Sequence, residues 1–338
     1  MQAGTNSALP DPATLDLRRE PAIPVTVLTG FLGSGKTTLI RRLIAHPALV
    51  DTAIIVNEFG EVGLDHRLVE AADEDTILLG GGCLCCATRG DLARALRSLL
   101  DRRERRELPP YRRVIVETSG LADPLPILQS FMADPLRLSR YRLSSLWALV
   151  DGILGPSTLD RHALARRQVA VADRVFVSKL DLMPQEKRAL RLTRIAAAAG
   201  RPAESAAEPG RTIELLKTGV AGSPLPHSIS AGEGIADDHA RDHVAISRRI
   251  DRPVAQNVLG AWIATTAETL GDRILRLKGL LRDTGGGILV IESVQHLWQP
   301  PRRFFRPPPP ECGTVVAIVG RGDRDAAEES LEQLASLS

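Results

Sequence analysis

The sequence predicts an α/β protein in which a doubly wound, mostly parallel sheet is followed by a smaller α+β domain. From Ile23 onward, short β-branched runs alternate with longer amphipathic stretches, which is the pattern of strand–helix–strand units. Runs such as 114–116 are apolar at every position, as expected for strands of a parallel sheet covered by helices on both faces. After residue 242 the order of the elements changes, and strands there follow one another with fewer helices between them.

The first domain is expected at residues 23–200, after a polar, disordered leader at residues 1–22 that contains early prolines. Its strands are expected at 23–29, 52–57, 76–79, 112–117, 145–151 and 173–178. Its helices are expected near 36–46, 90–103, 124–132, 160–171 and 184–199. Because the carboxyl ends of parallel strands meet at one edge of a sheet, we expect the segments that follow these strands to form one ligand crevice.

The second domain is expected at residues 243–338, beyond a linker at 201–242 that is rich in Ala, Gly, Pro, Ser and acidic residues. One short helix is expected inside the linker, around 212–218. The strands of the second domain are expected at 243–250, 273–281, 287–294 and 313–319, and its helices at 254–270 and 324–336. Cys312, alone at the start of a strand, is expected in the core.

Composition narrows the class of protein. Apolar residues make up 43% of the 338 and charged residues 25%, and the formal net charge is only +2, which gives no support to binding of nucleic acid or of an anionic membrane. The N-terminus lacks the basic start and apolar stretch of a signal peptide, and no apolar run reaches the roughly 18 to 20 residues that span a bilayer. We therefore expect a cytoplasmic protein whose four cysteines are ligands or free thiols.

Residues 30–38 are predicted to be a phosphate-binding loop. The segment fits the Walker A pattern and lies between a β-rich run and an amphipathic helix, which is the context that this motif requires. Backbone N–H groups in such a loop turn toward one point, and the helix N-terminus adds positive potential. Lys36 is expected to reach the outer phosphates and the Thr37 hydroxyl to bind Mg²⁺. The expected phosphate-binding residues are Gly30, Phe31, Leu32, Gly33, Ser34, Gly35, Lys36, Thr37 and Thr38.

The segment Glu117-Thr-Ser-Gly120 closes an apolar strand. At that position a carboxylate can face the magnesium shell, so Glu117 joins Lys36 and Thr37 as an expected catalytic residue. A glycine can approach the terminal phosphate, which is the expected role of Gly120.

The segment Ser178-Lys179-Leu180-Asp181 predicts a guanine nucleotide. Asp181 is placed to accept hydrogen bonds from the N1–H and 2-amino groups of guanine, and adenine offers no such pair of donors. The stem of Lys179 can pack on the base. Ser178 stands where asparagine is usual, which puts one supporting hydrogen-bond arrangement in question. The expected nucleotide is GTP rather than ATP.

The segment Gly80-Gly-Gly-Cys83-Leu-Cys85-Cys86 predicts a metal site. Three thiols within four residues, in a reducing compartment, suit Zn²⁺ or another soft to borderline metal. Cys85 and Cys86 are adjacent and cannot easily face one ion together, so two thiolates with outside ligands is an open variant. Inert buried cysteines and a thiol redox centre are further alternatives. Since strand ends converge, we expect the loop near the nucleotide, where hydrolysis would alter metal affinity.

The segment Asn57-Glu58-Phe59-Gly60-Glu61 follows the expected strand 52–57, in the position of a nucleotide-sensing switch. The carboxylates of Glu58 and Glu61 could complete the metal site or touch the magnesium shell. A solvated acidic turn is the alternative interpretation of this short motif.

In this order, the motifs resemble those of the CobW family of metallochaperone GTPases, relatives of the GTPases that mature nickel enzymes. The resemblance rests on the segments 30–38, 57–61, 82–86, 117–124 and 178–181. Segments later in the chain are also similar, so the resemblance covers about residues 23–322; these segments are 168–173, 275–279 and 316–320.

The resemblance implies a GTPase domain of SIMIBI type, a small C-terminal domain, and a cycle in which GTP binding and hydrolysis load a metal into a client metalloprotein. It implies that Cys83, Cys85 and Cys86 bind zinc, with Glu58 and Glu61 as accessory metal or switch residues. Cobalt (Co²⁺) and iron (Fe²⁺) stay open as the delivered metal. The seven histidines are scattered along the chain, which disfavours metal storage and is compatible with delivery of a single ion.

Two other classes of function remain open from the sequence. A P-loop kinase of a small molecule would need an acceptor pocket and a lid, and no Arg-rich lid segment is evident. A zinc-dependent interaction module would bind GTP without hydrolysing it. No arginine finger or water-orienting glutamine is evident either, so slow turnover is expected unless a client, or the second subunit of a homodimer, supplies the missing group.

Overall fold

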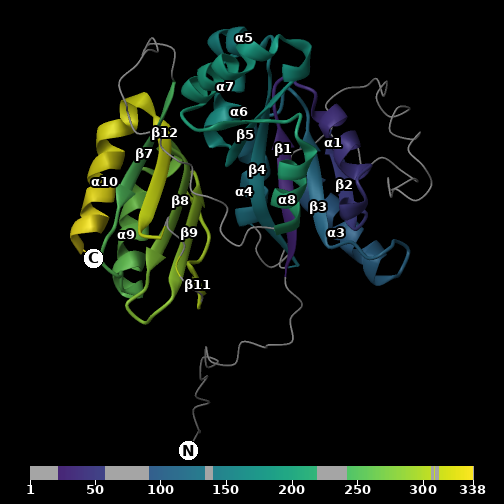
Figure 1. The fold of residues 1–338 in the computed structure, drawn as a ribbon. Helices are drawn as coiled ribbons and strands as arrows, with labels where there is room; N and C mark the ends of the chain where they lie inside the picture. The colour runs from purple at the N-terminus through teal and green to yellow at the C-terminus, as the bar shows by residue number, and fades with distance from the viewer. Residues whose placement is uncertain are drawn as a thin grey trace, which may run out of the picture.

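The computed structural model describes residues 22–57, 91–133, 140–218, 242–305, 308 and 312–337, which form two sheets with their helices (Figure 1). In the first sheet the strand order is β2-β3-β1-β4-β5-β6, and every neighbouring pair is parallel. Its strands are β1 (Ile23–Thr29), β2 (Thr52–Asn57), β3 (Arg113–Thr118), β4 (Tyr141–Asp151), β5 (Arg174–Ser178) and β6 (Ala203–Ser205).

Helices cover both faces of the first sheet. On β1, Val25 and Val27 pack into the cluster that contains Leu96, whereas Leu28 packs into the cluster that contains Leu43 on the opposite face. Both faces are therefore dry, which is why the strands are apolar at consecutive positions. The helical elements are α1 (Lys36–Ile44), η1 (Pro47–Leu49), α3 (Asp91–Glu104), α4 (Pro124–Ala133), α5 (Gly155–Arg161), α6 (Ala163–Val171), η2 (Leu180–Leu182), α7 (Gln185–Ala199) and α8 (Pro209–Thr218).

The second sheet is antiparallel, with the order β10-β9-β8-β12-β7 and with β11 paired to β9. Its elements are β7 (His243–Arg249), α9 (Gln256–Thr269), η4 (Gly271–Arg273), β8 (Ile274–Arg282), β9 (Ile288–Val294), β10 (Leu297–Trp298), β11 (Arg302–Phe304), β12 (Thr314–Gly320), η5 (Arg321–Asp323) and α10 (Arg324–Leu337). Helices α9 and α10 pack on one face, around Trp262. Cys312 is buried, as expected, in a small cluster on the other face.

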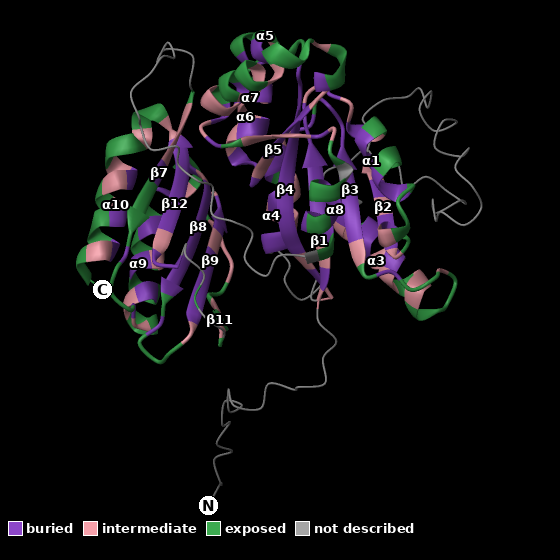
Figure 2. Ribbon diagram, in the orientation of Figure 1, coloured by how far each residue is buried: buried purple, intermediate pink, exposed green. Residues whose placement is uncertain are grey.

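The two sheets are joined by a buried polar contact. Arg276 and Lys278 lie on the face of β8 opposite to Leu277, which packs under α9 and α10. The guanidinium of Arg276 donates to Asp173 Oδ2 at 2.9 Å, and Lys278 Nζ donates to Asp173 Oδ1 at 2.6 Å. All three side chains are buried, and Figure 2 shows that burial continues along the central strands of both sheets, such as β1 and β4 in the first and β8 and β12 in the second.

The expected fold class is confirmed, and three elements differ from expectation. The helix expected at 160–171 is two helices, because the backbone is extended at His162. Strand β4 begins at Tyr141, four residues earlier than expected. The first part of the expected linker contains β6, a strand of the first sheet that was not expected, whereas the short helix expected around 212–218 is present as α8, which packs near α1. Short polar strands such as β6 carry little periodicity, which is why it was missed.

Several expectations lie outside the described residues. These are most of the leader at 1–22, the strand at 76–79, and residues 219–241 of the linker. Within the described part of the chain, none of the helices has the length and apolar content to cross a bilayer.

Candidate nucleotide-binding site

The loop between β1 and α1 closes tightly on itself. Gly30 has φ +147°, and a Cβ atom on it would lie 2.3 Å from the carbonyl oxygen of Leu149 on β4, so only glycine fits there. The side chain of Lys36 is buried, and its Nζ donates to the Gly30 carbonyl at 2.8 Å. The predicted Walker loop therefore has the strand–loop–helix form that its sequence indicated.

The carboxylate of Glu117 lies beside the start of α1. The Thr37 hydroxyl donates to Glu117 Oε1 at 2.7 Å, and Glu117 is 3% exposed. Behind them, the hydroxyl of Thr118 donates to Thr29 Oγ1 at 3.2 Å, which ties β3 to β1. A hydroxyl and a carboxylate in contact are hard oxygen donors of the kind that Mg²⁺ prefers, so this pair of residues fits the expected ion.

Gly120 lies directly against the Walker loop. A Cβ atom at this position would be 2.8 Å from the backbone nitrogen of Leu32, closer than any side chain tolerates. The loop at 119–123 turns at this point, with Ala122 N donating to the Ser119 carbonyl at 3.0 Å. The structure thus brings Gly120 to the loop at 30–38, as the sequence predicted.

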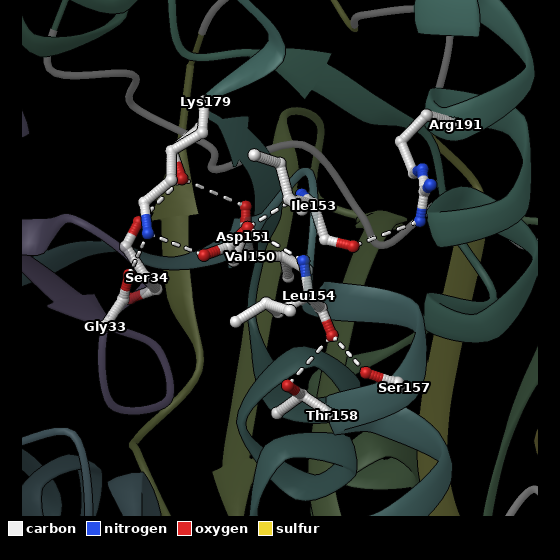
Figure 3. Close-up of polar contacts among 11 residues, drawn as sticks. Gly33, Ser34, Val150, Asp151, Ile153, Leu154, Ser157, Thr158, Lys179 and Arg191 are labelled. Atoms are coloured by element: carbon white, nitrogen blue, oxygen red, sulfur yellow. Dashed lines mark hydrogen bonds and ion pairs between the residues drawn. The ribbon is translucent and has the colours of Figure 1, made fainter. Parts of the chain in front are cut away.

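Ser178 and Lys179, which end and follow β5, donate hydrogen bonds to the Walker loop. The Ser178 hydroxyl donates to the Ser34 carbonyl at 2.7 Å, so a short side chain makes the connection at the position where asparagine is usual. Lys179 has a left-handed backbone (φ +56°), and its Nζ donates to the Gly33 carbonyl at 2.8 Å. Figure 3 shows Lys179 reaching from its strand end toward both Gly33 and Asp151.

Asp151, at the end of β4, is a site residue that the sequence reasoning did not select. Its carboxylate accepts from Lys179 Nζ at 2.6 Å and from the backbone N–H groups of Ile153 and Leu154 at 2.7 and 2.9 Å. Burial raises the pKa of Asp151, but the hydrogen bonds from Lys179, Leu154 and Ile153 outweigh it, and the pKa lies below its ordinary value. Asp151 is therefore ionised and fixes Lys179. The feature of the sequence that could have identified Asp151 is its position at the carboxyl end of an expected strand.

A hollow beside Asp181 completes this side of the site. Ala206 and Ala207, which follow β6, line it together with Lys179. Both alanines fall within the expected linker, so no sequence signal marked them as site residues. The other residues lining the hollow are Gly35, Thr38, Leu39, Arg42, Ser178 and Leu182.

The expected metal ligands Cys83, Cys85, Cys86, Glu58 and Glu61 lie outside the described residues. In the described ranges, no cluster of three or more His, Cys, Asp or Glu side chains is arranged to hold a metal ion. The segment that contains these residues follows β2 of the first sheet. Asn57, the last residue of β2, pairs with Thr118, the neighbour of Glu117.

Comparison with known proteins gives the family of both parts of the chain. The family model of the CobW/HypB/UreG nucleotide-binding domain matches residues 24–204, and that of the cobalamin synthesis protein CobW C-terminal domain matches residues 244–335. The chain is 32% identical over 287 residues to the zinc chaperone YjiA of Escherichia coli strain K12, which spans 82% of this chain and 87% of YjiA. It is 29% identical over 243 residues to the zinc chaperone CobW of Pseudomonas aeruginosa, spanning 63% of this chain and 60% of that protein.

Among solved structures, the Zn(II)-bound YjiA GTPase from E. coli matches with a TM-score of 0.65 and 26% sequence identity, over 94% of this chain and 100% of that one. The parallel sheet, the Walker loop and the family match define a P-loop GTPase. The chain belongs to the CobW family, in which this GTPase domain is followed by the CobW C-terminal domain.

Proposed function

We propose that this GTPase is a metallochaperone that binds zinc at Cys83, Cys85 and Cys86 and delivers it to a client metalloprotein under the control of GTP hydrolysis. One observation carries the proposal: the segment that leads to the cysteines begins beside the nucleotide site, because Asn57 pairs with Thr118 at the strand end next to Glu117. Three thiols favour zinc on chemical grounds, and the relatives YjiA and CobW are named zinc chaperones.

In this proposal each part of the nucleotide site has a role. The loop Gly30 to Thr38 binds the phosphates, Lys36 moves from the Gly30 carbonyl to the outer phosphates, and Gly120 contacts the terminal phosphate. Thr37 and Glu117 hold Mg²⁺, which neutralises the charge that develops on the phosphate oxygens. The guanine-binding residues are Ser178, Lys179 and Asp181, and the accessory metal or switch residues are Glu58 and Glu61.

The domain division follows the two sheets. We propose a GTPase domain that extends through α8, a connection within residues 219–241, and a C-terminal domain from residue 243. A client metalloprotein, or a second copy of the chain, completes the hydrolytic site. The family match favours release of phosphate to water over its transfer to a small molecule.

The test is GTP turnover with and without zinc. We expect zinc to change the turnover of the wild type and to leave that of a Cys85→Ala variant unchanged. Cys312→Ala is the matched control, because this thiol is buried in the C-terminal domain and should not alter the zinc response. A zinc response that survives in Cys85→Ala would remove the cysteine motif from the proposal.

A further inference from the structure

Gln168 is a polar residue on the apolar side of α6, between the buried residues Ala165 and Val169. It is 1% exposed. Its Nε2 donates to the carbonyl oxygens of Gly120 and Ala122, at 3.2 and 3.1 Å. Because both partners are carbonyls and can only accept, the orientation of the amide is determined: the NH₂ group faces the loop at 119–123.

The other half of the amide is buried without a partner in the part of the chain that the structure describes. Gln168 Oε1 has no hydrogen bond there. Gln168 lines a cavity that residues of the Walker loop, including Gly30 and Leu32, also line. A buried amide oxygen without a partner is unfavourable for stability, but a hydrophobic residue here would leave the buried Gly120 and Ala122 carbonyls without these hydrogen bonds. What the glutamine provides is therefore its contact with the loop at 119–123.

The loop at 119–123 is held between two surfaces. On one side Gly120 packs against the backbone of Leu32 in the Walker loop. On the other side Gln168 holds the Gly120 and Ala122 carbonyls, and the neighbouring Arg167 donates to Asp123 Oδ2 at 2.8 Å. Each accepted hydrogen bond fixes one peptide plane, because the peptide group is rigid. Gln168 thus fixes the position and orientation of the Gly120 main chain relative to the Walker loop.

We propose that Gln168 is a positioning residue for GTP hydrolysis, which keeps the main chain of Gly120 where the terminal phosphate of GTP meets it. The proposal rests on the phosphate role of the loops at 30–38 and 119–123 given above. Gln168 does not touch the nucleotide; it acts through Gly120. Its loss changes the geometry in which the terminal phosphate is held, so it lowers kcat more than it raises KM for GTP.

The experiment compares Gln168→Leu and Gln168→Glu in the full chain. For Gln168→Leu we expect kcat to fall about tenfold to a hundredfold, with KM for GTP and affinity for GDP changed about threefold or less. Gln185→Leu, on the exposed start of α7, is the control and should match the wild type.

The second variant gives a pH signature. A carboxylate cannot donate to the two carbonyls, whereas a protonated carboxyl group can donate to one of them. Burial raises the pKa of the introduced acid, so the activity of Gln168→Glu relative to the wild type should rise as pH falls from 8 to 6. A buried carboxylate that only destabilised the fold would also be relieved by protonation, so the folded fraction is measured at each pH and the rise is expected in kcat per folded protein. If Gln168→Leu fails to fold, the pH dependence of Gln168→Glu activity alone tests whether Gln168 positions Gly120.

Two results would overturn the proposal: an unchanged kcat in Gln168→Leu, or a Gln168→Glu activity ratio that is flat with pH. Failure of the underlying site assignment is distinguished by Lys36→Ala. If that variant hydrolyses GTP at the wild-type rate, the loop at 30–38 is not the phosphate site, whatever the Gln168 variants do.

Discussion

At the scale of single residues, the nucleotide site depends on short hydrogen bonds between strand ends. Ser178 and Lys179 both donate to carbonyls of the Walker loop, at Ser34 and Gly33, and Asp151 fixes the lysine. These hydrogen bonds hold the Walker loop in one conformation. Preorganisation of this kind improves affinity by reducing the ordering that binding requires.

Ser178→Ala tests this preorganisation. The change removes the 2.7 Å hydrogen bond to the Ser34 carbonyl, and a bond of this kind contributes about 0.5–1.5 kcal/mol. GDP affinity, measured by fluorescence titration, should weaken about two- to tenfold. Ser157→Ala is the control, because among the described residues that exposed hydroxyl bonds only to Leu154 and Arg161, at the two ends of its own helix. Equal affinity in Ser178→Ala and the wild type would show that the loop keeps its shape without Ser178.

Asp181→Asn tests the base-recognition role. An asparagine cannot accept both of the hydrogen bonds that guanine offers, but its amide can donate to the oxygen at position 2 of xanthine. We expect GTP affinity to fall by about a hundredfold or more and binding of xanthosine triphosphate to appear. Competition between the two nucleotides measures this. Retained preference for GTP in Asp181→Asn would place the base elsewhere.

At the residue scale, the sequence singled out candidate site residues where a motif stood at a strand end. Lys36, Thr37 and Glu117 were selected by sequence pattern, and the structure places them together. Asp151 and Gln168 were not selected, for different reasons. Asp151 stands at a strand end but in no familiar motif. Gln168 acts through a contact with residues more than forty positions away, which no local pattern contains.

At the scale of elements, α6 contacts both the nucleotide side and the C-terminal sheet. Near its start His162 stacks on Phe31 of the Walker loop, with ring centroids 4.6 Å apart. Its middle holds the loop at 119–123 through Gln168. Just beyond its end, Asp173 receives Arg276 and Lys278 from β8 and the backbone N–H of Leu146. The helix therefore connects the phosphate loop to the second sheet by direct contacts.

The ionisation of Asp173 depends on these contacts. Burial alone would raise its pKa, but the nearby Arg276 and Lys278 outweigh burial and lower the pKa of Asp173 to about 2. Burial and the neighbouring Arg276 lower the pKa of Lys278, and Asp173 only partly offsets them. Arg276 and Lys278 thus share the Asp173 carboxylate, and Lys278 has Glu292 as a second, more distant partner at 3.7 Å.

Asp173→Asn should be strongly destabilising. Removal of one partner from a buried ion pair costs about 3–5 kcal/mol, because Arg276 would remain buried without a counter-charge and Lys278 would keep only Glu292, at 3.7 Å. Urea unfolding of the full chain measures the change. The exposed Asp251, which pairs with Arg249, gives the control Asp251→Asn, and that variant should match the wild type.

The same carboxylate predicts an acid dependence. The folded pKa of Asp173 is below the ordinary value near 3.8, so its contribution is present above about pH 4 and is lost as pH falls toward 2. This contribution amounts to about 2–3 kcal/mol. Unfolding free energies measured between pH 5 and pH 2 should therefore fall less in Asp173→Asn than in the wild type. Parallel curves would contradict the assigned ion pairs.

At the scale of the whole molecule, two sheets of opposite type meet along buried surfaces. Helix α4, which follows the loop at 119–123, packs against β9 and β10, and Val294 of β9 joins the core of the first sheet. The C-terminal sheet thus contacts the elements that follow the proposed phosphate-sensing loop. This arrangement fits a protein in which the nucleotide state alters the second domain.

The fold class was predictable because its signals are local: apolar strands, amphipathic helices and a loop motif between them. The relation between the sheets was not. Arg276 and Lys278 read as ordinary alternating positions of a strand, and only the folded chain shows that they share Asp173. Strand β6 was missed for a related reason, since a three-residue polar strand is defined by its partner β5.

In the proposed function, GTP controls the metal site. The most direct test is the zinc affinity of the full chain, measured by competition with a chromophoric chelator, with a non-hydrolysable GTP analogue and with GDP. Coupling of the two sites predicts affinities that differ at least about tenfold, which corresponds to about 1.4 kcal/mol, and loss of this difference in Cys85→Ala. Equal zinc affinity in the two nucleotide states would contradict the claim.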